Sequence, residues 1–215
     1  MRVEDKKQQK LDRIIESASE LFASSEYHEV CMDDIAVQAK VGKGTLYNLF
    51  TSKEDLYFSI IRHRLGELIS ILERTYDSRN DTLKNLRSLI LHLHKFMSKH
   101  PDFYLLWKKE ETLSGGASRQ PELSDLHGRV IELIVNVLKR GETEGVLLPA
   151  NDHGLVAHVL LGMIDGLRKS RERVFEKERD IDGLFAILLR GIAAEGAELA
   201  VTYDEYRHVS GKGGA

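Results

Sequence analysis

Apolar residues recur at intervals of three and four along almost the whole chain, and this is the spacing of an amphipathic helix. The first stripe of this kind lies near the start of the chain and consists of Leu11, Ile14, Ile15, Ala18, Leu21 and Phe22. No segment alternates apolar and polar residues for long enough to indicate a β-strand. The sequence therefore predicts an all-α fold of about nine helices.

Interruptions of these stripes indicate where each helix begins and ends. Two short helices are expected before and after Val41, and a fourth helix is expected to begin near Lys53. Ser52 and Asp55 support this last boundary because their spacing is close to that of a capping box. Five later helices are expected at about 82–99, 102–113, 121–145, 151–174 and 181–201.

The composition of the 215 residues is that of a soluble globular protein, with 42% apolar and 30% charged residues. The apolar runs are shorter than the roughly 20 residues that cross a membrane, and the charged N-terminus lacks a secretion signal. A single cysteine, Cys31, fits a reducing compartment. We therefore expect a cytoplasmic protein that has no membrane partner.

The formal net charge of −3 gives no general sign of nucleic-acid binding, but the charges are unevenly distributed. Residues 35–53 contain Lys40, Lys43 and Lys53 and no acid, whereas acidic residues flank this window on both sides. Positive charge is therefore concentrated around the third expected helix.

The first three expected helices have the layout of a helix-turn-helix unit, in which two short helices pack on a longer one. Five apolar residues of the short pair would face inward: Ile35, Ala36, Val41, Leu46 and Phe50. The outer side of the third helix would present Lys43, Gly44, Thr45, Tyr47 and Asn48. Such a face is narrow, free of acids and rich in hydrogen-bonding groups, which suits the major groove of DNA. The pattern alone favours DNA binding and a purely structural helical hairpin about equally.

A resemblance to a known family favours the first of these interpretations. The run "CMDDIAVQAKVGKGTLYNLFTSKEDLY", at residues 31–57, resembles the DNA-binding domain of the TetR/AcrR family of transcriptional regulators. The resemblance covers about residues 8–60 when the preceding amphipathic helix is included. It implies that Lys43, Thr45 and Tyr47 contact DNA.

The same resemblance implies a phosphate contact for Lys53 and makes Asn48 the side chain best placed to read a base edge. Gly44 would let the backbone come close to the DNA because glycine has no side chain. Lys40 would add a positive charge nearby, and it occupies a turn position that is usually glycine in the family. We therefore expect a positive φ angle at Lys40.

Two further positions depart from the family pattern. Cys31 stands where the family prefers a Thr or Ser N-cap, and its sulfur is a weaker hydrogen-bond acceptor, so the second helix should begin less firmly. Leu49 stands where the family has Tyr or His, and we expect it to pack instead of contacting a phosphate.

The resemblance and the helix pattern together predict three regions. Residues 1–52 would form the helix-turn-helix DNA-binding domain, 53–205 a larger helical domain for ligand binding and dimerisation, and 206–215 a disordered tail. The last two long helices are apolar on more than one face and carry small residues such as Gly162 and Gly166. They would form a homodimer interface, although a tightly packed monomer core is the alternative.

The middle helices would form the cavity for a small-molecule effector. Its candidate lining residues are Phe96, Met97, Phe103, Tyr104, Leu106, Trp107 and Met163, with His92, His94, His127 and His158 as possible polar anchors. Taken singly, each of these residues is more readily explained as part of an ordinary core, which is the more frequent situation for aromatic residues at helical spacing.

The sequence contains no recognisable catalytic motif and no His, Cys or Asp cluster with the spacing of metal ligands, so we expect neither an enzyme nor a cofactor. The favoured function is a dimeric repressor that a small-molecule ligand releases from a double-stranded DNA operator. Two alternatives stay open. One is an architectural or cell-division DNA-binding protein without such an effector, and the other is an interaction module with no DNA role.

Overall fold

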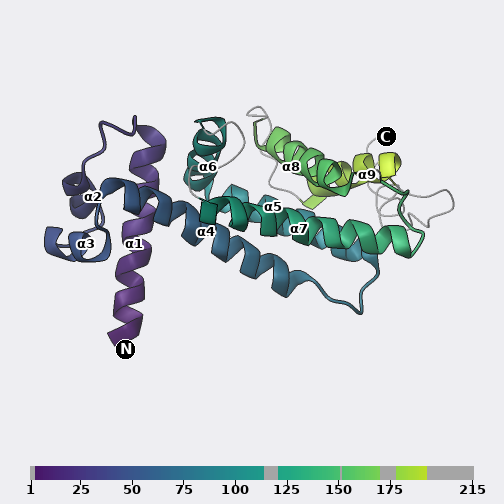
Figure 1. Cartoon of the computed structure of the whole chain (residues 1–215), viewed down its shortest axis with the longest axis horizontal. Helices are drawn as coiled ribbons and strands as arrows, with labels where there is room; N and C mark the ends of the chain where they lie inside the picture. Colours follow the sequence, from purple (N-terminus) through teal and green to yellow (C-terminus); the bar gives the residue numbers. More distant parts are fainter. Residues whose placement is uncertain (1–2, 114–120, 151, 170–177, 193–215) are drawn as a thin grey trace, which may run out of the picture. The chain divides into compact units, whose positions relative to one another are not determined.

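The computed structural model describes residues 3–113, 121–150, 152–169 and 178–192. Within these ranges every secondary-structure element is an α-helix, which confirms the predicted all-α class (Figure 1). The described helices are α1 (Val3–Ser24), α2 (Met32–Gln38), α3 (Lys43–Leu49), α4 (Lys53–Thr75), α5 (Thr82–Lys99), α6 (Pro101–Leu113), α7 (Pro121–Thr143), α8 (His153–Lys169) and α9 (Glu178–Ile192).

The chain forms two compact units, and three long helices contribute to both. The first unit contains residues 1–69 and 96–128, and the second contains 70–95 and 129–215. The first unit therefore holds α1, α2, α3 and α6, together with most of α4, the end of α5 and the start of α7. The domain boundary between residues 52 and 53 stays a prediction, and the expected disordered tail lies outside the described residues.

The core of the first unit forms where α1 packs against α2 and α6. Ile14 and Ala18 of α1 are fully buried, as are Ile35 of α2 and Leu46 of α3. Ala36 and Phe50 are also buried, and Val41 is half-buried in the turn between the short helices. The predicted inward-facing residues therefore do form the apolar side of the helix-turn-helix unit.

Local capping explains why α4 begins at Lys53, as predicted. The backbone N–H of Asp55 donates to the hydroxyl of Ser52 at 3.0 Å, and the Asp55 carboxylate accepts from the backbone N–H of Thr51 at 2.8 Å. The first bond satisfies an N–H group that a helix start would leave without a partner, and the second fixes the chain just before the helix.

Later helix boundaries differ from the expected ones by a few residues. Helix α8 begins at His153 instead of 151, because Asp152 acts as its cap and accepts from the backbone N–H of Leu155 at 3.0 Å. Helix α9 begins at Glu178, three residues before the expected start. Apolar spacing cannot locate a polar first turn, which explains this second difference. The expected extensions to 174 and 201 reach beyond the described residues.

Beside its buried apolar residues, the second unit has an ion pair between two helices and a close approach of side chains to the backbone of α7. Arg87 of α5 donates from Nε to Asp182 of α9 at 2.7 Å, and both side chains are mostly buried. Gly141 of α7 must be glycine, because a Cβ atom there would come within 2.8 Å of side-chain atoms of Leu147 and Thr82. Because Gly141 has no side chain, the chain after α7 can fold back toward α9. There the N–H of Leu148 donates to the carbonyl of Ile192 at 2.7 Å.

Candidate nucleic-acid interface

A tight turn at residues 39–42 places α3 against α2. The N–H of Val41 donates to the carbonyl of Ala36 at 3.0 Å, and Lys40 adopts a φ of 54°. This confirms the positive φ expected at Lys40, in a region that a side chain other than glycine enters only at a cost. Gly42 then forms the N-cap of α3. The turn is therefore fixed by backbone geometry, and it determines which side of α3 faces outward.

The outward side of α3 carries the residues predicted to contact DNA. Lys43, Gly44, Tyr47 and Asn48 are exposed, with 52% of Tyr47 accessible, and Thr45 is half-buried. A Cβ atom at Gly44 would meet no other atom within 4 Å, so no internal contact requires a glycine there. The structure thus brings these residues together on one accessible face, and their contacts with DNA stay a prediction.

The ammonium group of Lys43 is engaged by an acid of the same unit. Its Nζ lies 2.5 Å from Oδ2 of Asp33, which is in the first turn of α2. The hydrogen bond and charge of Asp33 raise the pKa of Lys43, so Lys43 stays fully charged near neutral pH. Sequence reasoning missed this pairing, because nothing in the spacing of the two residues shows that the starts of α2 and α3 meet.

Lys53 binds to the connection between α1 and α2. Its Nζ donates to the carbonyls of Tyr27 at 2.8 Å and Val30 at 2.9 Å, and lies 3.4 Å from that of His28. The same group sits 4.6 Å from the centre of the Tyr27 ring. An ammonium has three N–H donors, and this arrangement gives each of them an acceptor. The phosphate contact expected for Lys53 stays a prediction, and the structure adds this internal contact to it.

The start of α2 has no side-chain cap, and the less firm start expected from Cys31 stays a prediction. Cys31 is the N-cap of α2 and makes no side-chain capping bond, and its Sγ lies 3.8 Å from the carbonyl of Glu29. Asp33 and Asp34 lie in the first turn, where negative charge is favourable beside the helix dipole. Leu49 is half-buried.

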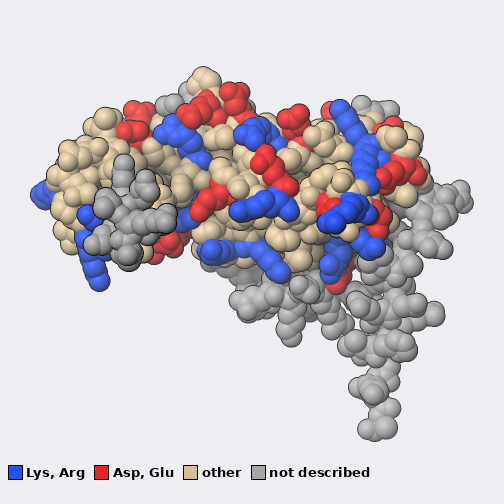
Figure 2. Space-filling model, turned by 90° about the horizontal axis from the view of Figure 1, so that it is seen from below, with Lys and Arg blue, Asp and Glu red and all other residues tan. Residues whose placement is uncertain are grey.

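On the face that Figure 2 shows, the part of the first unit that carries α2 and α3 has isolated Lys and Arg side chains on a mostly uncharged surface. Affinity for a polyanion would therefore depend on a few local contacts, in line with the net charge of −3.

The candidate ligand-pocket residues fall into both units. In the first, Phe96, Phe103 and Tyr104 are buried, and the rings of Phe96 and Phe103 are 6.0 Å apart. Trp107 is half-buried and lies 4.9 Å from the ring of His127. In the second unit, two further candidates are less enclosed: exposed His158 and half-buried Met163. The structure therefore brings together Phe96 and Phe103, and their part in ligand binding stays a prediction.

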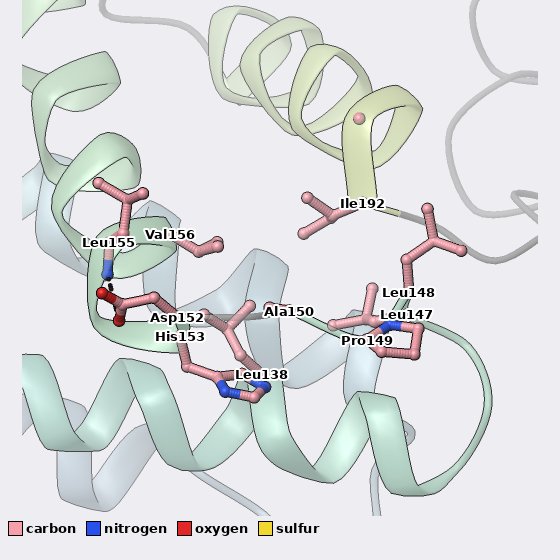
Figure 3. A pocket seen from close by; sticks show the side chains of 11 residues that line it. Leu138, Leu147, Leu148, Pro149, Ala150, Asp152, His153, Leu155, Val156 and Ile192 are labelled. Atoms are coloured by element: carbon pink, nitrogen blue, oxygen red, sulfur yellow. Dashed lines mark hydrogen bonds between the residues drawn. The ribbon is translucent and has the colours of Figure 1, made fainter.

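A hollow in the second unit was not anticipated from the sequence. It has a volume of about 320 Å³, and apolar side chains of α7, α8, α9 and the α7–α8 connection form most of its wall. Figure 3 shows Leu148 and Ile192 on one side of it and Leu155 and Val156 on the other. His153 lies at its edge and contacts Glu142 at 2.7 Å. A connecting loop supplies several lining residues, and helical periodicity says nothing about loops.

Two kinds of feature are absent from the described part of the chain. No group of three or more His, Cys, Asp and Glu residues there could hold a metal ion. None of the helices in the same ranges is both long and apolar enough to cross a membrane.

The exposed face of α3, the fixed turn before it and the supporting α1 define a helix-turn-helix DNA-binding protein. Residues 14–60 match the family described as "Bacterial regulatory proteins, tetR family". These residues thus carry a TetR-family DNA-binding domain, so the resemblance seen in the sequence is confirmed for this part of the chain.

Known proteins extend this likeness beyond the matched domain. The fatty acid metabolism regulator protein of Bacillus subtilis is 24% identical over 159 residues, which are 74% of this chain and 81% of that protein. The nucleoid occlusion factor SlmA of Vibrio cholerae is 24% identical over 164 residues, or 75% and 83% of the two chains. The structure of the regulator FadR from Bacillus subtilis, in complex with stearoyl-CoA, has 20% identity and a TM-score of 0.69. It covers 84% of this chain and 98% of that one, and it supports the fold alone.

Proposed function

We propose that the protein is a dimeric cytoplasmic repressor that reads an operator with α3 and leaves it when a small apolar molecule binds. The observation that carries the proposal is the exposed, acid-free face of α3, held outward by the turn at Lys40. A short helix presented in this way fits the major groove of DNA.

Each residue of this face has a proposed role. Asn48 and Tyr47 would reach base edges and the neighbouring backbone, while Lys43 and Thr45 would hold phosphates near the start of α3. Gly44 would allow the helix to approach closely. Lys40 would add attraction at longer range, and Lys53 would contact a phosphate only if it leaves the carbonyls that it now binds.

A second copy of the chain is the proposed partner of α8 and α9. Within residues 153–166, the exposed residues of α8 recur on one side of the helix and carry no charge: Leu155, His158, Val159, Gly162 and Gly166. Leu155 is 61% exposed, and Ile187 on α9 is 63% exposed. Such an uncharged stripe with small residues suits close packing between helices of two protomers. Paired half-sites on DNA would then match the two α3 helices of the dimer.

The effector is proposed to be a fatty acyl thioester or a chemically similar apolar acid. Two comparisons point to this class: a relative from Bacillus subtilis is named for fatty acid metabolism, and the similar structure of FadR from the same organism was solved with stearoyl-CoA. The buried aromatic residues Phe96, Phe103 and Tyr104 would supply apolar contacts at the α5–α6 junction. Ligand binding would lower operator affinity only if the ligand prefers the conformation that does not fit the operator.

Fluorescence anisotropy tests the DNA-binding part of this proposal. A labelled duplex from the region upstream of the protein's own gene is compared with a scrambled duplex at near-physiological salt. The native duplex should bind more tightly, and Tyr47→Ala should remove most of the difference. Equal binding of both duplexes would contradict a role at that site, and selection from random DNA would then show whether another operator exists.

The effector is tested with the same complex. Stearoyl-CoA should release the operator, whereas CoA without an acyl chain serves as the control.

A second function, a DNA-binding cell-division factor without an effector, is favoured by one observation, the likeness to SlmA. Dispersed DNA sites, and complexes that no acyl-CoA dissociates, would support that function over a ligand-released repressor.

A further inference from the structure

We infer that Asp33 tunes the affinity for DNA by competing with DNA phosphates for Lys43. Asp33 thus sets how much of the positive charge of α3 is available to DNA. The inference rests on the proposed function, in which α3 binds DNA, and goes beyond it by assigning a role to a residue of α2.

The geometry places the competitor where a phosphate would bind. Lys43 is the first residue of α3 and Asp33 lies in the first turn of α2, so the pair sits at the starts of both helices. Their side chains are in contact at 2.5 Å and remain 63% and 52% exposed. The ion pair is therefore open to solvent, and an external oxyanion can reach Lys43 without any movement of the backbone.

The Asp33 carboxylate and a DNA phosphate are both anionic acceptors for the Lys43 ammonium group. Binding of one therefore weakens or prevents binding of the other. When Lys43 turns to a phosphate, Asp33 loses its partner and lies close to a second negative group. Exposed ion pairs of this kind are weak, so DNA can displace Asp33. The free energy of the broken pair is subtracted from the electrostatic free energy that Lys43 gains with the phosphate.

The effect should be measurable in this protein because residues 35–53 supply only three lysines to this interface. Of the three lysines in residues 35–53, Lys53 binds backbone carbonyls and Lys43 binds Asp33 in the free protein. The phosphate term supplies most of the affinity for non-specific DNA and much of that for an operator. A single acid that occupies Lys43 therefore weakens binding to both kinds of DNA by a similar factor.

The test compares Asp33→Asn with Asp34→Asn. Both residues are exposed acids in the first turn of α2, so both changes remove one charge and the same favourable interaction with the helix dipole. In the described structure the contact with Lys43 is recorded for Asp33 and not for Asp34. Circular dichroism and thermal melting confirm that both variants are folded.

Asp33→Asn should raise affinity for the operator and the scrambled duplex in parallel, by about two- to five-fold more than Asp34→Asn does. The slope of log K against log salt should also become steeper by up to about one unit, because Asp33 no longer takes up a cation as Lys43 leaves it. In a Lys43→Met background, the two Asn variants should become equivalent.

The outcomes separate the inference from the function on which it rests. If Lys43→Met weakens DNA binding but Asp33→Asn and Asp34→Asn behave alike, the competition is refuted and the proposed function stands. If Lys43→Met leaves binding unchanged, Lys43 has no phosphate contact and the competition is refuted as well. If the wild type binds no DNA in any duplex or selection, the proposed function itself fails.

Discussion

The Lys53 ammonium lies over the Tyr27 ring, 4.6 Å from its centre, and donates to the carbonyl of the same residue at 2.8 Å. One side chain at the start of α4 thus closes the connection between α1 and α2. This contact joins residues 26 positions apart and links the start of α4 to the segment that precedes α2. It gives Lys53 a structural reason to be present, independent of any contact with DNA.

Replacement of Lys53 should therefore reduce stability. Lys53→Met keeps the apolar stem but removes the hydrogen bonds and the cation–π contact, and we expect a loss of about 2 kcal/mol in the free energy of unfolding. Urea denaturation followed by circular dichroism measures this loss. Lys10→Met, at an exposed position of α1, is the control and should change stability little. A Lys53→Met protein of unchanged stability but weaker DNA binding would instead assign Lys53 to phosphate recognition.

The strained turn residue gives a second prediction. Lys40 has a φ of 54°, so Lys40→Gly should relieve strain and raise the free energy of unfolding, by at most about 1 kcal/mol after the entropy of glycine in the unfolded chain is subtracted. Lys40→Ala keeps the strain and should bring no such gain. Both variants lose the same charge, so they should share any decrease in DNA affinity. Equal stability of the two variants would contradict strain at this position.

Local contacts could be predicted from the sequence, and contacts between distant segments could not. The start of α4 was predictable because Ser52 and Asp55 are three residues apart and the capping bond is local. The positive φ of Lys40 followed from its position in a family turn. By contrast, the contact of Lys53 with Tyr27 depends on how the long helices pack, and no local pattern records that.

The candidate binding sites likewise contain some features that local sequence predicts and others that depend on tertiary packing. The outward face of α3 could be predicted, because helical periodicity decides that Leu46 is buried while Tyr47 and Asn48 are not. The pair between Asp33 and Lys43 could not, since it depends on the angle at which two short helices meet. The hollow beside α8 was unpredictable as well, because the loop that carries Leu148 contributes to it.

Acid should destabilise the first unit through His100. Burial, followed by the positive charge of Arg64, lowers the pKa of His100 below its usual value. The unfolded chain therefore binds a proton on this residue at a higher pH than the folded chain does, and stability is lost as pH falls from about 6.5. His100→Gln should flatten this dependence between pH 7 and pH 5, measured by urea denaturation at each pH. The same change at the exposed His28 is the control, and an identical pH profile for both variants would refute the assignment.

The exposed stripe of α8 gives the prediction that bears most directly on assembly. Leu155 is 61% exposed and Val159, one turn later, is 52% exposed, so a charge at either position would have to be buried if a second copy packs there. Burial of an unpaired carboxylate is strongly unfavourable. Leu155→Glu should therefore shift the protein to monomers in sedimentation velocity and weaken operator binding at least ten-fold, because two half-sites are no longer bound together. Leu105→Glu introduces the same charge at a residue of α6 that is 44% exposed, and it should leave the oligomeric state unchanged. A wild-type protein that sediments as a monomer at micromolar concentration would refute the proposed dimer, and dimers that survive Leu155→Glu would place the interface elsewhere.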